Sequence, residues 1–319
     1  MVPPAAVRVV AVVVAWNRRD LLARTLDGLA AQERPVDAVV VIDNASTDDS
    51  AALASSHPVV SEVLTLPRNT GGAGGFAAGV AVALQRHAAD RVWLMDDDTV
   101  PLPGALAALL DAWAAHPGPV TLAASRADWH DGREHPMNTP RERFGLTRSA
   151  RAAATAVGAR AVRSASFVSV LVDAAAVRTH GLPEAAYFLW NDDFEFTARL
   201  LRRGVGLYVP ASRVQHLTKV FGMSDADPGP RFRNEVRNKV WLFTRSPALG
   251  VRDRLLYAGS TLRRWARMLA RSADRIALVR HGWAGLREGV GRPPSTTAVL
   301  ADTPVAADVA AIERGAGRA

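Results

Sequence analysis

Strand-length apolar runs alternate with helical patterns through the first third of the chain. The runs predict buried strands over residues 7–15, 36–42, 59–66 and 92–95. Apolar residues at helical spacing predict helices over residues 18–31, 50–56, 76–87 and 103–115. This alternation predicts a mostly parallel central sheet flanked by helices, an α/β fold of the Rossmann-like kind.

The pattern loosens beyond residue 117. Residues 125–149 are polar and predict an irregular loop region, whereas 161–172, 207–210 and 213–217 contain short strand-like runs. Residues 231–291 are basic and helical in pattern, and 292–319 are rich in Pro, Thr, Ala, Asp and Gly, which favours a disordered tail. We therefore expect an α/β domain over 1–230, a basic helical segment over 231–291 and a disordered tail over 292–319.

The bulk composition limits the possible compartments. The chain has 319 residues and no cysteine, so disulfides and thiolate metal sites are excluded. No apolar run approaches the ~20 residues needed to span a bilayer. The first strand begins too early to leave room for a signal peptide. We expect a cytoplasmic protein, either free or peripheral at the inner face of the cell membrane.

The positive charge is concentrated near the C-terminus. The net charge is +8, yet residues 231–292 hold 15 Lys or Arg and only 4 Asp or Glu. Arginines flank an apolar stripe there, made of Leu255, Ala258, Leu262, Trp265 and Leu269. Residues 246–290 are therefore a candidate contact with an anionic membrane surface. The alternatives are a polyanionic partner, or an ordinary helical face that packs on the core.

Three consecutive carboxylates, Asp96, Asp97 and Asp98, directly follow the apolar run 92–95. Adjacent anions repel one another unless a cation lies among them. Asp96 and Asp98 point to the same side of an extended backbone, which suits a Mg²⁺ or Mn²⁺ ion shared with a substrate phosphate. The alternative is a solvated turn.

Polar residues follow three other predicted strands in the same way. Ligands bind open parallel sheets at the carboxyl ends of their strands, so four such ends predict a pocket for a nucleoside diphosphate. The residues at the other three ends are Trp16 and Asn17, Asp43 and Asn44, and the run Arg68, Asn69, Gly71, Gly72. Glycines in this run either line a substrate or pack a helix tightly against the sheet.

A second acidic cluster, Asp192 and Asp193, lies among aromatic residues at a predicted helix start. These carboxylates either cap the helix or act as a general base in an apolar pocket. His216 ends a predicted strand and is either structural or a further metal ligand.

These motifs together resemble the inverting glycosyltransferases of family 2, which have a GT-A fold. The segments that carry this resemblance are 12–18, 41–48 and 96–98. The segments 68–76, 93–98 and 190–195 more narrowly resemble bacterial galactofuranosyltransferases and rhamnosyltransferases. The resemblance covers about residues 7–245. It implies a metal-dependent transfer of galactofuranose or rhamnose from a UDP- or dTDP-sugar to a glycan or polyprenyl-linked acceptor, in cell-envelope polysaccharide synthesis.

The resemblance also implies roles for individual residues. Asp43 and the Trp16 region would hold the base and ribose, and Trp190 would line the acceptor or sugar pocket. Asp96 and Asp98 would bind the metal, with His216 completing the site. Asp193 would be the catalytic base, although Asn191, an insertion relative to some relatives, leaves Asp192 as the alternative. Arg237 and Asn238 match an Arg-Asn pair to which the resemblance gives no role.

Two other classes of protein remain open at this point. A nucleotidyltransferase also joins carboxylate-bound Mg²⁺ to a parallel sheet, but it usually has a Gly-rich loop after the first strand, where this chain has Trp16 and Asn17. A non-enzymatic nucleic-acid-binding protein would explain the basic segment. It would not explain acids collected at strand ends, which repel phosphate, so we expect no nucleic-acid partner.

Overall fold

A computed structural model describes residues 7–221 and 228–316 of the chain, and ten strands in this part form one sheet. The strands are β1 (Val9–Ala15), β2 (Ala38–Asp43), β3 (Glu62–Thr65), β4 (Arg91–Asp96), β5 (Thr99–Pro101), β6 (Val120–Asp128), β7 (Arg141–Glu142), β8 (Arg160–Ser164), β9 (Val170–Asp173) and β10 (Val205–His216). Their order is β3-β2-β1-β4-β9-β6-β10-β8-β7, and β5 pairs with β10 off this path.

The sheet is mostly parallel, as the sequence predicts. Strand β1 pairs in parallel with β2 and β4, and β2 with β3. Strand β9 lies antiparallel between β4 and β6, so β6 and its parallel neighbour β10 run in the same direction as the first four strands. The carboxyl ends of the main strands therefore meet at one edge of the sheet.

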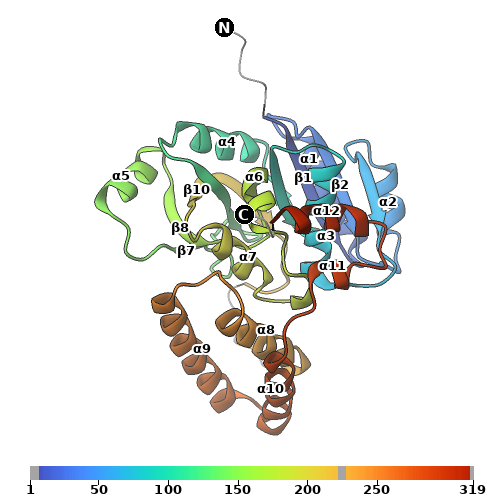
Figure 1. The fold of residues 1–319 in the computed structure, drawn as a ribbon. Helices are drawn as coiled ribbons and strands as arrows, with labels where there is room; N and C mark the ends of the chain where they lie inside the picture. The colour runs from blue at the N-terminus through green and yellow to red at the C-terminus, as the bar shows by residue number, and fades with distance from the viewer. Residues whose placement is uncertain (1–6, 222–227, 317–319) are drawn as a thin grey trace.

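Helices cover both faces of this sheet (Figure 1). One face packs on α1 (Arg19–Ala30), α2 (Ser50–Ser56), α4 (Ala105–Ala115) and α5 (Arg148–Ala156). The other packs on α3 (Gly71–Gln85), α6 (Ala174–His180), α7 (Asp192–Leu200) and α12 (Ala306–Ala316). Every side chain of β1 is buried, because alternate residues of this central strand point into two different cores.

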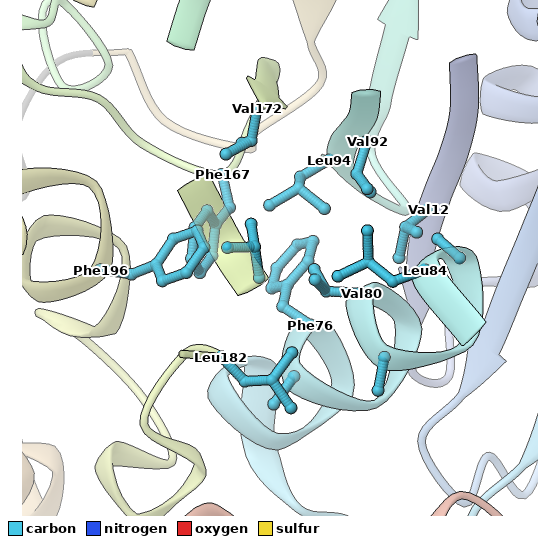
Figure 2. Close-up of a cluster of buried hydrophobic side chains, with 14 of the residues drawn as sticks. Val12, Phe76, Val80, Leu84, Val92, Leu94, Phe167, Val172, Leu182 and Phe196 are labelled. Carbon is cyan, nitrogen blue, oxygen red and sulfur yellow. The ribbon is translucent and has the colours of Figure 1, made fainter. Parts of the chain in front are cut away.

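The core on the α3 face joins the two halves of the sheet (Figure 2). Phe76 of α3 packs on Phe167, with ring centroids 4.5 Å apart, and Phe167 packs on Phe196 of α7 at 5.8 Å. These aromatic contacts link α3, which follows β3, with α7, which carries the second acidic cluster. The relative position of the two halves is thus fixed by a dry core.

Helix α3 begins earlier than the sequence suggests. The glycines of residues 71–75 were expected in a loop, yet they form the first turns of this helix. A Cβ on Gly75 would lie 2.5 Å from Cγ1 of Val14, and one on Gly79 would collide with Val12. Close packing of the helix on β1 therefore outweighs the low intrinsic helix propensity of glycine.

The middle of the chain is more regular than its composition indicates. Residues 125–149, expected to be irregular, contain the end of β6, the short β7 and the start of α5. The two strands expected over 207–217 are one strand, β10, with a register shift between Val209 and Arg213. The expectation failed because these segments lack long apolar runs and are paired by partners distant in sequence.

Three helices, α8 (Phe232–Thr244), α9 (Val251–Arg271) and α10 (Arg275–Val290), occupy the basic segment. They extend away from the sheet below α7 (Figure 1). Among the described residues, no helix has the length and apolar character required to cross a bilayer. The division of the chain into domains at residues 230 and 291 stays a prediction.

The expectation of a disordered tail over 292–319 is wrong for the described residues, although 317–319 lie outside them. Residues 296–316 form α11 (Thr296–Val299) and α12, which return to pack beside α3 (Figure 1). Leu300, Val305, Val309 and Ile312 are buried in the core on that face. These apolar residues are few and are diluted by Ala, Asp and Pro, which hid the pattern.

Candidate active site

Three neighbouring strands bring predicted site residues to one edge of the sheet. Ala15, the last residue of β1, is paired with Asp43 of β2, and Val14 is paired with Asp96 of β4. Trp16 follows directly, and its backbone N–H donates to Oδ2 of Asp97 at 2.9 Å. The structure therefore brings Trp16, Asp43 and the three consecutive aspartates together, as the sequence predicts.

Asp96, Asp98 and His216 form a cluster suited to a divalent cation. One ligand atom from each lies within 4.8 Å of the others. His216 reaches Asp98 because β10 pairs with β5 at the position opposite Thr99. Oδ1 of Asp98 is buried, accepts no hydrogen bond from the described residues, and lies 3.3 Å from Nε2 of His216. An imidazole and two carboxylates, one of which has a buried oxygen without a hydrogen-bond donor, fit a Mn²⁺ or Mg²⁺ ion.

Asn138 sets the tautomer of His216, and sequence reasoning missed it. Its Oδ1 lies 2.8 Å from Nδ1 of His216, and both side chains are buried. An amide oxygen only accepts, so Nδ1 carries a proton, and Nε2 is the ring nitrogen that faces Asp98. Such a partner orients a metal-binding imidazole. Asn138 lies in a polar segment without periodicity, which offered no signal.

The pKa values of the three aspartates are shifted in different directions. Burial, with Asp98 and Asp97 adding to it, raises the pKa of Asp96 well above its ordinary value. Burial also raises the pKa of Asp97, to about 6, against the opposing effect of Arg18. Burial would raise the pKa of Asp98 too, but His216 and Arg18 outweigh it and lower that pKa. Crowded carboxylates of this kind favour a cation among them.

The base-binding side of the edge is formed by Asp43 and its neighbours. Asp43 is buried, its Oδ2 accepts the Ser46 N–H at 3.3 Å, and its Oδ1 has no hydrogen-bond partner in the described residues. Trp16 is 50% exposed above this edge. Asn17 instead braces the following loop, since its Oδ1 accepts the Thr47 N–H at 2.7 Å. Asp43 and Trp16 remain available to a ligand.

Several predicted substrate-binding residues build the scaffold. Asn44 is buried and fully engaged: Nδ2 donates to Oδ1 of Asn69 and to the Gly71 carbonyl, while Oδ1 accepts from Thr70. Gly71 has φ +72°, and a Cβ there would collide with the Phe188 carbonyl. Gly72 faces open space. The glycine turn thus approaches the protein's own backbone at Gly71.

Arg68 lies outside the site. Its Nη2 lies 3.0 Å from Oδ1 of Asp302 and donates to the Val299 carbonyl at 2.6 Å. The side chain therefore ties β3 to the C-terminal helices. The expectation that Arg68 contacts the donor stays a prediction; in this structure the side chain is bound by the segment that was expected to be a disordered tail.

The second acidic cluster begins α7. Burial, followed by Asp193, raises the pKa of Asp192 to about 8. Burial also raises the pKa of Asp193, against the opposing effects of Lys239 and Arg141. Asp193 lines a cavity of about 640 Å³, whereas Asp192 does not. Glu195, the third acid, is buried and pairs with Arg199, so its role is structural.

The segment before α7 has an unusual backbone. Phe188, Trp190 and Asn191 all have positive φ, at 61°, 70° and 65°. Non-glycine residues in this region each cost of order 1–3 kcal/mol and persist only where the surroundings enforce them. The segment places Trp190 on the cavity wall and aims the start of α7.

Asn238 of α8 enforces this conformation. Its Nδ2 lies 2.8, 3.0 and 2.8 Å from the carbonyl oxygens of Tyr187, Leu189 and Trp190, and its side chain is fully buried. Arg237 adds a bond to the Tyr187 carbonyl at 3.0 Å. The Arg-Asn pair thus positions the acidic cluster. The sequence signal was a polar residue within the apolar face of a predicted helix.

The cavity lies between the carboxyl edge of the sheet and the C-terminal helices. Its lining includes Asn138, which also contacts His216, and Trp190 and Asp193. The other walls come from residues 137–141 and 164–166, from Pro228 and Arg231, from α8 and from α9. A candidate base therefore shares one hollow with a residue that touches the metal cluster.

Comparisons with known proteins agree with this geometry. The model of the family "Glycosyltransferase like family 2" matches residues 4–237. Galactofuranosyltransferase GlfT1 of Mycolicibacterium smegmatis is 33% identical over 201 residues, and GlfT1 of Mycobacterium tuberculosis 34% over 203. Each match covers 62% of this chain and 66% of the relative, just under two thirds of its length.

Solved structures share the fold at low sequence identity. Staphylococcus aureus TarS, residues 1–349, has a TM-score of 0.60 at 14% identity, covering 97% of this chain and 88% of that one. GalNAc-T7 with UDP, GalNAc and Mn²⁺ gives 0.58 at 14%, covering 97% and 58%. PcManGT of Pyrobaculum calidifontis with GDP-Man and Mn²⁺ gives 0.52 at 18%, covering 98% and 88%. The fold is that of the GT-A glycosyltransferases.

Family membership favours glycosyl transfer over the nucleotidyltransferase and nucleic-acid-binding alternatives. The matched region contains both acidic clusters and the glycine turn. The chain is a glycosyltransferase of family 2, related to the galactofuranosyltransferases.

Proposed function

We propose that this enzyme transfers a sugar, galactofuranose or rhamnose, from a UDP- or dTDP-sugar to a hydroxyl of a glycan or polyprenyl-linked acceptor, with inversion. The curated relatives are named galactofuranosyltransferases, which favours galactofuranose. The observation that carries the proposal is the cluster of Asp96, Asp98 and His216 beside a cavity lined by Asp193. Such products belong to cell-envelope polysaccharide synthesis.

Asp96, Asp98 and His216 would hold the divalent cation, and two structural neighbours bind Mn²⁺ together with a nucleotide or nucleotide sugar. When bound, the cation would neutralise charge on the leaving diphosphate. Asp43 would accept a hydrogen bond from the base through its free Oδ1, and Trp16 would cover the base or ribose. These residues orient the donor so that its anomeric carbon faces the cavity.

Asp193 would act as the general base. Its carboxylate takes the proton from the acceptor hydroxyl as that oxygen attacks the anomeric carbon on the face opposite the leaving group. General-base assistance contributes ~10²–10⁴-fold. The neighbouring Lys239 and Arg141 oppose the pKa-raising effect of burial on Asp193 and so favour the ionised carboxylate that proton removal requires. Asp192 is more buried and stays outside the cavity.

Transfer assays with Asp193→Asn and the matched Asp192→Asn test this assignment. We expect Asp193→Asn to lose at least ~10²-fold in kcat, while UDP binding, measured by calorimetry, is unchanged. Chelation should abolish transfer, and Mn²⁺ or Mg²⁺ should restore it. Near-normal turnover in Asp193→Asn, with Asp192→Asn inactive, would assign the base to Asp192; absence of transfer with every UDP- and dTDP-sugar would refute the proposal.

An anionic membrane surface remains the proposed partner of residues 246–290, at the cytoplasmic face. The exposed apolar residues differ partly from the predicted stripe, because Ala258 and Trp265 are partly buried, with Trp265 packed against Phe232 of α8. The exposed large apolar residues on α9 and α10 are Val251, Leu255, Leu256, Leu262, Leu269, Ile276, Val279, Trp283, Leu286 and Val290. Binding to anionic vesicles that is lost in a Leu255→Ser/Trp283→Ser double variant would support this surface; equal binding would contradict it.

A further inference from the structure

The cavity beside Asp193 is lined by three cationic side chains that have no ion-pair partner among the described residues. Arg141, Arg231 and Lys239 line it, and none forms an ion pair with a carboxylate of the described residues. Arg264, on the same wall, shows the ordinary arrangement, since it pairs with Glu235. Asp193 attracts Lys239 and Arg141 from the same wall, but the lining holds Arg141, Arg231, Lys239 and Arg264 against only two acids, Asp193 and Glu235. The lining therefore has a net positive charge, which favours an anion in the cavity.

Lys239 is the most informative of these side chains. It is largely buried, and its ammonium has only ring contacts, 5.2 Å from the centroid of Phe194 and 5.8 Å from that of Phe243. Burial, followed by the repulsion of Arg141, lowers its pKa to about 8. The buried Arg199, in contrast, has Glu195 as its partner. Lys239 thus lines the cavity without an ion pair or hydrogen bond to the described residues, and the attraction of Asp193 is a smaller effect on its pKa than burial.

The hydroxyl of Tyr257 is a second unpartnered group on the same wall. It is buried and has no hydrogen-bond partner in the described residues. Its ring is held by Phe194, with centroids 5.1 Å apart, so the hydroxyl is fixed rather than free to rotate away. A buried hydroxyl without a partner is unusual and points to a group absent from the protein.

These groups match the chemistry of a phosphate ester. Arginine and lysine bind phosphate through charge-assisted hydrogen bonds, and a tyrosine hydroxyl adds a neutral donor. A volume of about 640 Å³ is larger than an inorganic phosphate requires and suits a phosphate attached to a sugar. Trp190 and Phe232 supply flat apolar walls for such a sugar.

We propose that Arg141, Arg231, Lys239 and the Tyr257 hydroxyl bind a phosphate or diphosphate group carried by the acceptor, which places an acceptor hydroxyl at Asp193. This inference rests on the proposed function, and it adds the anionic class of the acceptor and the residues that select it. Asp96 and Asp98 do not line the cavity, so this anion site is separate from the one predicted for the donor diphosphate.

Binding of inorganic pyrophosphate to the full chain in EDTA tests the site without catalysis. We expect one site in calorimetry, at least tenfold weaker in Lys239→Met, about threefold weaker in Tyr257→Phe and restored in Lys239→Arg. Arg151→Met, which removes one exposed charge from α5, should bind as the parent does. If Lys239→Met does not fold, Tyr257→Phe and Lys239→Arg still decide; equal binding in Tyr257→Phe and the parent, or no binding at all, overturns the site.

Transfer assays then distinguish the sources of the phosphate. A polyprenyl-linked glycosyl diphosphate, a water-soluble glycosyl phosphate and the same glycan without phosphate would be compared. We expect Lys239→Met to raise the acceptor KM at least tenfold for both phosphorylated acceptors, with the donor KM and the KM of the phosphate-free glycan unchanged. Preference for the polyprenyl form alone would assign the anion to a lipid-linked acceptor.

The anion site and the proposed transferase function can be refuted separately. Transfer to all three acceptors with equal KM, or a Lys239→Met effect on the donor KM instead, would overturn the anion site and leave the proposed transferase function intact. Pyrophosphate binding as expected, with no transfer from any nucleotide sugar, would leave the anion site and overturn the proposed function.

Discussion

Replacing Asn238 with Asp removes the donors that hold the segment before α7. The substitution preserves side-chain shape, but a carboxylate has no donor, and a protonated carboxyl has one O–H in place of the two N–H donors of the Nδ2 amide. That amide lies within 3.0 Å of three backbone carbonyls, those of Tyr187, Leu189 and Trp190, in a fully buried position. The variant therefore places carboxyl oxygens against carbonyl oxygens at the point that positions Asp193.

The magnitude follows from the contacts. Each hydrogen bond contributes a net ~0.5–1.5 kcal/mol, and the amide has two N–H donors shared among the three carbonyls, so their loss costs about 1–3 kcal/mol. The positive-φ residues Phe188, Trp190 and Asn191 each cost of order 1–3 kcal/mol, so the loss is enough for the segment to relax. If about 2 kcal/mol of this free energy is needed to hold Asp193 in place for the reaction, kcat/KM falls ~30-fold, since 1.36 kcal/mol corresponds to tenfold.

The assay compares kcat/KM of Asn238→Asp with that of Asn234→Asp, which makes the same chemical change on a partly exposed position of the same helix. Amide hydrogen exchange over residues 187–193 reports local order, and urea unfolding reports global stability. We expect faster exchange there and reduced activity at a urea concentration where the protein stays folded. Activity within twofold of Asn234→Asp, with unchanged exchange, would refute the positioning role.

Three further predictions follow from the same structure. Asn138→Ala should weaken Mn²⁺ binding ~10–100-fold in calorimetry, because His216 loses the partner that orients it. Burial raises the pKa of Glu184 to about 7, so the stability that this side chain contributes falls as pH rises from about 4.5 to 7. Glu184→Gln should therefore raise the free energy of unfolding by up to about 3 kcal/mol at pH 8 and by little at pH 5, as measured by urea titration. Leu300→Ala should cost ~2–5 kcal/mol of unfolding free energy, whereas a disordered tail would give no change.

The sheet edge was predictable because its signals are local in sequence. A central parallel strand is buried on both faces, so β1 and β4 read as unbroken apolar runs. The polar residue that ends such a run must lie at the carboxyl edge, which placed Asp43 and Asp96 in advance. His216 was found for the same reason, at the end of β10.

The remainder of the site depends on pairings that no local pattern encodes. The sequence of β9 is one more apolar run, but its antiparallel position between β4 and β6 depends on tertiary contacts. Asn138 and Asn238 act through side-chain hydrogen bonds to partners distant in sequence. A polar residue in a loop, or one turn of a helix, gives no indication of which distant group it will meet.

The charged side chains of the described site divide into two sets, and this division fits the proposed reaction. At the sheet edge the excess is negative, and the pKa of Asp96 is raised by burial and by its acidic neighbours. On the cavity wall the excess is positive, and the pKa of Lys239 is lowered by burial and by Arg141. Each set reduces the stability of the ligand-free protein, and each would be relieved by a ligand of opposite charge. Asn138, which lines the cavity and contacts His216, lies where the two sets meet, which is where a donor and an acceptor of these charges would exchange a sugar.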